Sequence, residues 1–367
     1  SSAASDVYKR QDYPVKGCGI WLPNGFELKQ RVIEIIRELL KTTNHKEVQF
    51  PLLIPKEMLE KEAQHIAGFL DQVFWVTKGG DSQLGVELAL RPTSETPMTF
   101  YFRKLVMSYK DLPLKVFQIV SIFRYETKAT HPMIRVREVT MFKEAFTFHS
   151  SFEEAIKQTY EAYKIYSKFF EILCIPVIVV ERPEWDRFPG ADISIAFDTI
   201  LPNGKSLQVG SIHNLGQKFA KAFEFMFTKP DGTREYVYQT SYGISERVIA
   251  SMIIHHGDEI GVILLPNLAP IQIVIVPIVY EENKIEILNY SREVYDIIKV
   301  CGYRVVLDDD LEKTPGEKFY KWERIGVPLR IEIGPREMKE RSLLFALRIG
   351  EKYKVKTYLV METFLAC

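Results

Sequence analysis

Apolar residues at helical spacing form the first clear element of the chain. They are Leu28, Val32, Ile35, Ile36 and Leu39. Because they recur every three or four positions, the pattern predicts an amphipathic helix that ends near residues 42–44. Asn24 precedes the run as a candidate cap, and Glu27 follows three residues later to complete a capping box.

Residues 48–54 are mostly apolar and predict a buried strand, which Pro51 interrupts and Pro55 ends. A proline cannot donate a hydrogen bond to a neighbouring strand, so it belongs at a sheet edge or an interface. The edge would lie either at the surface of the domain or against a second subunit.

The middle of the chain alternates in the manner of antiparallel strands. Strands are predicted at residues 114–125, 136–148, 194–201, 206–211 and 235–242. A loop rich in cations joins the first two strands, and Asn203-Gly204 is a strong hairpin turn. Residues 152–172 predict an amphipathic helix, and residues 245–255 a second helix that follows a strand and a glycine.

The pattern changes after Ala269-Pro270. Strands predicted at 271–279, 303–307 and 329–333 alternate with helices predicted at 285–300 and 316–325. We therefore expect two domains: residues 1–270, rich in antiparallel hairpins with flanking helices, and residues 271–367, a smaller α/β domain. The fold class of the whole chain is α/β in the broad sense that includes α+β.

Composition narrows the classes of protein that fit. The 367 residues are 46% hydrophobic and 26% charged, which excludes a disordered chain. The 48 basic and 48 acidic residues cancel, so a polycationic coat for nucleic acid is not expected, although one basic face is possible. The longest apolar stretch, near residues 262–279, is broken by prolines, so no membrane span is predicted.

Cysteine usage and the start of the chain bear on the compartment. Cys18, Cys174, Cys301 and Cys367 form no CxxC pair and have no metal spacing, so neither structural zinc nor a disulfide scaffold is expected. The first six residues lack the apolar region of a secretory signal. A reducing, cytoplasmic location is the expectation.

The sequence lacks the common glycine-rich loops that bind phosphate. The sequence has no GxxxxGK[ST] loop and no GxGxxG after a strand, and it also lacks GxSxG and HExxH. If the chain handles a nucleotide, side chains must hold its phosphates. The cations between residues 116 and 148 and Arg247 are the candidates, because a guanidinium can bind two phosphate oxygens at once.

Three short polar segments, each taken alone, can be explained by ordinary structural roles. Arg124 and Glu126 would share one strand face and form a surface ion pair. Residues 91–96 would begin a helix capped by Thr93 or Ser94, and residues 243–247 would begin another after a turn.

Taken together, the segments resemble a known class. RPTSE (91–95), FRYE (123–126), FKEAFTFH (142–149), VGSIHNLGQ (209–217) and YGISER (242–247) occur in the order of the class II aminoacyl-tRNA synthetase motifs. Within that class the chain most resembles the prolyl-tRNA synthetases of the archaeal/eukaryotic-like type, over about residues 10–350. The resemblance implies a catalytic domain with motif 1 at about 26–55, motif 2 at about 116–148 and motif 3 at about 236–270. An anticodon-binding domain would follow.

The resemblance also implies an ATP site. Its residues would be Arg124, Glu126, Arg135, Phe142, Gln208, Ser245 and Arg247. Arg124 would contact the α-phosphate, and Arg135 and Arg247 would contact the distal phosphates. Glu126 would meet the adenine amino group and Gln208 the ribose. Arg124 and Arg247 would be the catalytic residues, and Mg²⁺ would arrive with ATP.

The amino-acid site implied by the resemblance lies beside it. Its residues would be Thr93, Glu95, Arg124, Phe142, Phe146, Ser211 and His213. A carboxylate and a hydroxyl suit the secondary ammonium of proline, and Arg124 suits its carboxylate. Close relatives commonly have histidine where this chain has Phe146, which would alter one wall of the pocket.

Partners follow from the same resemblance. They are tRNA(Pro), proline, ATP and a second copy of the chain, with Pro51 at the dimer interface. Residues 271–367 would bind the anticodon stem-loop, and Tyr320, Trp322, Arg324, Arg330 and Arg336 are either RNA contacts or ordinary core and surface residues.

Two other functions stay open. One is a sister synthetase for threonine, glycine or histidine, against which RPTSE and GSIHNLGQ both argue. The other is a synthetase-like RNA-binding module that does not charge tRNA, which would be expected to lose Arg124, Glu126 and Arg247.

Overall fold

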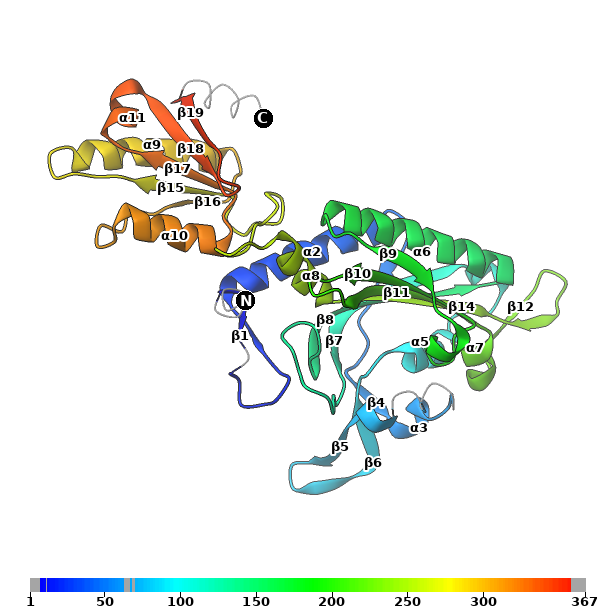
Figure 1. Ribbon diagram of the computed structural model, residues 1–367. Coiled ribbons are helices and arrows are strands. Elements are labelled where there is room, and N and C mark those ends of the chain that lie inside the picture. Colours follow the sequence, from blue (N-terminus) through cyan, green and yellow to red (C-terminus); the bar gives the residue numbers. More distant parts are fainter. Residues whose placement is uncertain (1–6, 11, 63–66, 68–69, 358–367) are drawn as a thin grey trace. The chain divides into compact units, whose positions relative to one another are not determined.

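The computed structural model describes residues 7–10, 12–62, 67 and 70–357, and Cys367 and the first six residues lie outside this part (Figure 1). The chain divides into two compact units. The larger unit contains Arg10–Ile20 and Val32–His255, and the smaller contains Ser1–Lys9, Trp21–Arg31 and His256–Cys367. The boundary predicted near residue 270 stays a prediction.

A seven-stranded sheet forms the centre of the larger unit, in the order β3-β7-β8-β14-β11-β10-β9. The strands are β3 (Lys46–Glu47), β7 (Leu114–Phe123), β8 (Glu138–His149), β14 (Tyr238–Ser245), β11 (Ser206–Gly216), β10 (Ile193–Ile200) and β9 (Ile178–Glu181). Neighbours are antiparallel except β3, which runs parallel to β7. The hairpin predicted from the two strands around the basic loop is confirmed as β7–β8.

Helix α6 (Phe152–Ile172) covers one face of this sheet and has the bounds that the apolar pattern predicts (Figure 1). The Ser151 side chain caps it by accepting a hydrogen bond from the Glu154 amide at 3.2 Å. On β8, Lys143 points to this helix, since its Nζ donates to the Tyr166 hydroxyl at 2.6 Å. Side chains alternate along a strand, so Phe142 and Glu144 point to the opposite face.

Smaller elements complete the larger unit. A three-stranded sheet has the order β4-β6-β5, and β12 and β13 form a hairpin. The bounds are β4 (Leu53–Pro55), β5 (Phe74–Gly79), β6 (Ser82–Leu90), β12 (Met226–Thr228), β13 (Arg234–Tyr236), α3 (Lys56–Leu59), α5 (Glu95–Phe102) and α7 (Lys218–Phe223), with 3₁₀ turns η1 (Leu70–Gln72), η2 (Tyr109–Asp111) and η3 (Glu184–Asp186). Helices α2 (Pro23–Lys41) and α8 (Arg247–His256) have residues in both units.

Two local predictions are wrong. Asn24 does not cap the first helix, because α2 begins at Pro23 and its first turn closes when the Phe26 amide donates to the Leu22 carbonyl at 2.8 Å. Proline is favoured at this first helical position, where no amide proton is needed. Residues 48–54 do not form one strand either: β3 and β4 belong to different sheets and are separated by the segment around Pro51.

The smaller unit contains a mixed five-stranded sheet of order β16-β15-β17-β18-β19. Its elements are β15 (Ile273–Pro277), α9 (Lys284–Val300), β16 (Val305–Leu307), α10 (Pro315–Ile325), β17 (Leu329–Ile333), α11 (Pro335–Glu340), β18 (Ser342–Leu347) and β19 (Lys352–Lys356). Strands β1 (Lys9–Arg10) and β2 (Ile20–Trp21) form a separate two-stranded sheet. The β15-to-β17 alternation of strand and helix is confirmed. One apolar cluster packs α9 against the sheet and another packs α10 against it.

Two of the proposed RNA-contacting residues lie in the core of this unit. The indole of Trp322 is buried and donates to Asp308 at 2.6 Å, while buried Arg330 pairs with Glu332 at 3.0 Å. Tyr320, by contrast, is 59% exposed. The positions of Trp322 and Arg330 therefore favour a structural role.

Among the described residues, no helix combines the length and the apolar composition that crossing a bilayer would require.

Candidate active site

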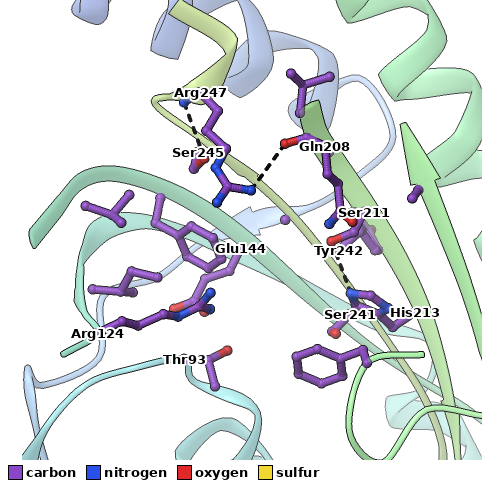
Figure 2. Close-up of a pocket in the computed structure, with 18 of the residues that line it drawn as sticks. Thr93, Arg124, Glu144, Gln208, Ser211, His213, Ser241, Tyr242, Ser245 and Arg247 are labelled. Carbon is purple, nitrogen blue, oxygen red and sulfur yellow. Dashed lines mark hydrogen bonds between the residues drawn. The ribbon is translucent and has the colours of Figure 1, made fainter. Parts of the chain in front are cut away.

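One cavity of about 260 Å³ lies in the larger unit and collects residues from all the polar segments (Figure 2). Its lining includes Thr93, Glu95, Arg124, Glu126, Arg135, Phe142, Gln208, Ser211, His213, Ser245 and Arg247. The sequence-predicted site residues are thus brought together, with the exceptions of Phe146 and Pro51. The side chains of Arg124 and Arg247 point into the same space from different sides of the cavity (Figure 2).

Arg124 follows directly after β7 and is held against the neighbouring segments. Its Nε donates to the Pro92 carbonyl at 3.3 Å, and its guanidinium carbon lies 5.8 Å from the centre of the Phe142 ring. The strand ends at Phe123, and the Glu126 amide donates back to the Arg124 carbonyl at 2.8 Å. A tight turn, and not an extended strand face, therefore brings Arg124 and Glu126 to one cavity.

Burial lowers the pKa of Arg124, and the positive charge of Arg247 lowers it further, while Glu95, Glu126 and Glu144 oppose the shift. An arginine keeps its proton at neutral pH even so, because its ordinary pKa is above 12. Two mutually repelling guanidinium groups in one cavity make a site that an anion would stabilise.

Arg247 is the first residue of helix α8 and lies two positions after the end of β14. Its Nε donates to the Ile134 carbonyl at 2.7 Å and its Nη1 to the Gln208 carbonyl at 3.4 Å (Figure 2). The turn before it is fixed by Glu246, whose carboxylate accepts from the Thr140 hydroxyl at 2.8 Å. Arg247 is therefore tied to the basic loop and to β11 at the same time.

The Gln208 side chain is held by Arg182. Its Oε1 accepts from Arg182 Nη2 at 3.3 Å, and the same nitrogen pairs with Asp198 at 2.7 Å. Arg182 also lines the cavity, so this wall carries a cation that sequence reasoning did not select.

At the other end of the cavity, the Thr93 hydroxyl donates to the Glu95 carboxylate, which Ser241 also bonds. Burial raises the pKa of Glu95, and these hydrogen bonds and the charge of Arg124 oppose the rise. The arrangement presents an acceptor next to a cation, which suits a ligand that carries both an ammonium and a carboxylate.

His213 is packed and hydrogen-bonded on both ring nitrogens. Its Nδ1 lies 2.9 Å from Ser194 Oγ and its Nε2 3.1 Å from Ser211 Oγ, and its ring stacks on Phe188 with centroids 4.4 Å apart. Burial lowers the pKa of His213 to about 3, so the imidazole is neutral at physiological pH. It forms a polar wall that does not compete with Arg124 for an anion.

The structure places Phe146 in an apolar cluster with Met98 and Phe102, outside the cavity lining, which corrects the expectation that it forms a pocket wall. Pro51 is exposed, and its carbonyl accepts from Arg91 Nη1 at 3.2 Å. Its predicted position at a dimer interface stays a prediction.

Several lining residues were missed by sequence reasoning. They are Glu144, Arg182, Arg187, Phe188, Ser194, Ser241 and Glu246. The run from Arg182 to Phe188 contains two arginines and two aromatic residues, with one proline inside it and another directly after it, a composition that could have marked it as a binding loop. In the described ranges, no group of three or more histidine, cysteine, aspartate or glutamate residues is arranged to hold a metal ion.

Comparison with known proteins first defines the class. Residues 74–256 match the class II tRNA synthetase core domain (G, H, P, S and T), and residues 272–358 match an anticodon-binding domain. The fold of the larger unit and the convergence of motif 2 and motif 3 arginines agree with this class.

The particular family follows from individual relatives. The chain is 55% identical over 346 residues to the proline–tRNA ligase of Sulfurisphaera tokodaii, covering 94% of the chain and 72% of the relative. It is 51% identical to that of Methanocaldococcus jannaschii, covering 98% and 80%. The chain belongs to the prolyl-tRNA synthetase family.

Solved structures agree with this family. Giardia lamblia prolyl-tRNA synthetase in complex with prolyl-adenylate matches with a TM-score of 0.95 at 40% identity, covering 98% of this chain and 75% of that one. The Cryptosporidium parvum enzyme complexed with halofuginone and AMPPNP matches with a TM-score of 0.92 at 35% identity, covering 99% and 75%.

Proposed function

We propose that the protein activates proline with ATP and transfers the prolyl group to the 3′ end of tRNA(Pro). The observation that carries the proposal is the meeting of Arg124 and Arg247 in one cavity beside Thr93, Glu95 and His213. Membership of the prolyl-tRNA synthetase family supports it, since the relatives named above are proline–tRNA ligases.

The proline end of the cavity would be the end lined by Thr93 and Glu95. The Glu95 carboxylate accepts from the secondary ammonium, and Arg124 binds the proline carboxylate. Neutral His213, stacked on Phe188, forms a wall against which the ring packs, and Ser211 holds the imidazole in place. The match between a cyclic, zwitterionic amino acid and these groups is the basis of selectivity.

The ATP end would be the end lined by the two arginines and the basic loop. Arg124 also contacts the α-phosphate, Arg135 and Arg247 the distal phosphates, and Glu126 the adenine amino group. Gln208, steadied by its hydrogen bond from Arg182, takes the ribose. Phe142 stacks on the base, and Ser245 accepts from the Arg247 amide to set the turn. Mg²⁺ enters as part of the ATP substrate.

The reaction needs no covalent bond to the enzyme. A carboxylate oxygen of proline attacks the α-phosphorus, the bond to the β-phosphate oxygen breaks, and pyrophosphate leaves. The 3′-hydroxyl oxygen of the terminal adenosine then attacks the prolyl carbonyl carbon. The bond from this carbon to the phosphate oxygen breaks, AMP leaves and the hydroxyl proton is released. Arg124 and Arg247 position the reactants and neutralise charge that develops on the phosphates.

The rest of the chain would serve tRNA recognition and assembly. The match of residues 272–358 to an anticodon-binding domain supports binding of the anticodon stem-loop. We further propose that the protein works in the cytoplasm as a homodimer, with the segment around Pro51 at the interface.

Proline-dependent exchange of pyrophosphate into ATP tests the proposal. The wild-type protein should catalyse exchange with proline and not with threonine, glycine or histidine, and Arg124→Ala should abolish it. Exchange with another of these amino acids would indicate a sister synthetase. Binding of tRNA(Pro) without exchange or charging would indicate a non-catalytic RNA-binding module.

A further inference from the structure

Glu144 lies in the wall of the cavity and takes no part in the reaction described above. We propose that Glu144 is a positioning residue for proline activation, which holds Ser94 and thereby its two neighbours, Thr93 and Glu95, at the start of helix α5. The inference rests on the proposed function, because it concerns the amino-acid end of the same site.

Three buried side chains form the contact. Ser94 Oγ donates to Glu144 Oε1 at 2.5 Å, and Gln118 Nε2 donates to the same oxygen at 2.7 Å. Gln118 Nε2 also lies 3.1 Å from Ser94 Oγ, which closes a triangle. All three residues are at most 3% exposed. Hydrogen bonds in such buried surroundings are stronger than exposed ones, so this triangle fixes the geometry of the helix start.

Ser94 does not cap helix α5 with its side chain. It occupies the N-cap position of α5, where a serine side chain normally accepts from a backbone amide of the first turn, but in the described structure it makes no such bond. Its hydroxyl instead donates a hydrogen bond to Glu144 on β8, a strand distant in sequence. The residues on either side of Ser94 are Thr93 and Glu95, so the anchor point lies within the proline-binding segment.

The network continues to the segment around Pro51. Gln118 Oε1 accepts from the Phe50 amide at 2.9 Å, and Arg91 Nη1 donates to the Phe50 carbonyl at 2.9 Å. Arg91 is the first residue of the RPTSE segment. This segment is therefore held from both ends, by Glu144 through Ser94 and by residues 50–51 through Arg91.

The second oxygen of Glu144 argues against a purely stabilising role. Oε2 is buried and has no hydrogen-bond partner among the described residues. A buried, incompletely bonded carboxyl close to Glu95 costs stability, and an apolar residue of similar size would avoid that cost. Its charge interacts with Glu95, Arg91 and Arg124, which belong to the site or its supports, and with Lys143 on the other face of the sheet. Local departures from full hydrogen bonding of this kind collect at functional sites.

Kinetics of pyrophosphate exchange test the proposal with Ser94→Ala, Glu144→Ala and the double variant. Each single change should raise the KM for proline by about tenfold and leave the KM for ATP within about twofold, since the loss of one buried hydrogen bond is of that order. The double variant should resemble the worse single variant, not the product of the two, because both single changes remove the same bond between Ser94 and Glu144. Ser94→Ala is a small change that keeps the test valid if Glu144→Ala is insoluble.

A matched control is Gln158→Leu on α6. Gln158 is also buried and hydrogen-bonded, to Tyr242 at 3.2 Å, but it does not line the cavity. It should lower the melting temperature without changing the ratio of the two KM values. An unchanged KM for proline in Ser94→Ala and Glu144→Ala, or an equal rise for ATP, overturns the inference. Absence of proline-dependent exchange in the wild type would instead overturn the proposed function.

Discussion

Replacing Glu144 with glutamine should flatten the pH dependence of the free energy of unfolding. Burial, and next the charge of Glu95, raise the pKa of Glu144 to about 7, from an ordinary value of 4.5. Between pH 4.5 and 7 the folded state therefore holds a proton that the unfolded state has released. Stability must fall as pH rises through this window, and it levels off once the folded carboxyl has ionised.

The magnitude follows from the same values. From pH 6 to pH 8 the folded carboxyl goes from mostly protonated to mostly ionised, while the unfolded carboxyl is ionised throughout. The wild type should therefore lose about 1 kcal/mol of unfolding free energy over this range relative to Glu144→Gln. Urea unfolding of the two proteins at pH 6, 7 and 8 measures the difference.

The control for this experiment is Glu138→Gln, which removes a carboxylate from the same strand but outside the cavity. Its unfolding curves should shift with pH as the wild type's do. Parallel pH profiles for Glu144→Gln and the wild type would refute the reasoning, because they would mean that Glu144 is ionised in the folded protein at pH 6.

Three further changes probe other parts of the site. Arg124→Lys should lower kcat/KM in pyrophosphate exchange by about 100-fold or more, because an ammonium cannot bind two oxygens as a guanidinium does. Gly243→Ala should raise the KM for ATP several-fold, because a Cβ there would lie 3.2 Å from Phe142 Cζ and displace the ring. Phe146→Leu should lower the melting temperature by opening a gap in the core, at a cost of about 1–2 kcal/mol. It should leave the KM for proline unchanged. A rise in that KM would indicate that Phe146 does line the proline pocket.

The sequence predicted best where periodicity and local capping agree. Helix α6 has an apolar stripe, a serine cap and no interrupting proline or glycine, and its predicted bounds are those observed. The β5–β6 hairpin was missed although Gly80, with a positive φ of 59°, marks its turn. Much of β6 is exposed, so its sequence lacks the run of apolar residues on which a strand prediction rests.

Tertiary contacts explain the wrong prediction for residues 48–54. An apolar run is expected to form a ladder because its backbone groups need partners. At Phe50 those partners are side chains: Gln118 accepts from the amide, and Arg91 donates to the carbonyl. Both lie far along the chain, so no local pattern could reveal that the backbone is satisfied without a strand.

The site shows the same division between what local sequence predicts and what only packing decides. The motif residues could be found because their order along the chain matches a known class. Glu144 could not, since its raised pKa and its bonds to Ser94 and Gln118 depend on the meeting of α5, β7 and β8. The sequence of β8 mixes charged, polar and apolar residues, so nothing in it distinguishes Glu144 from its neighbours.

Phe146 shows why the face of a strand is an incomplete guide to a site. Phe142, Glu144 and Phe146 have the same parity on β8, so all three point to the same side of the sheet. Two residues advance a strand by about 7 Å, however, which carries Phe146 beyond the end of the cavity. There α5 covers the sheet, and Met98 and Phe102 enclose the ring. Parity fixes the direction of a side chain, but the helix packed above it decides whether that direction leads to a ligand or to the core.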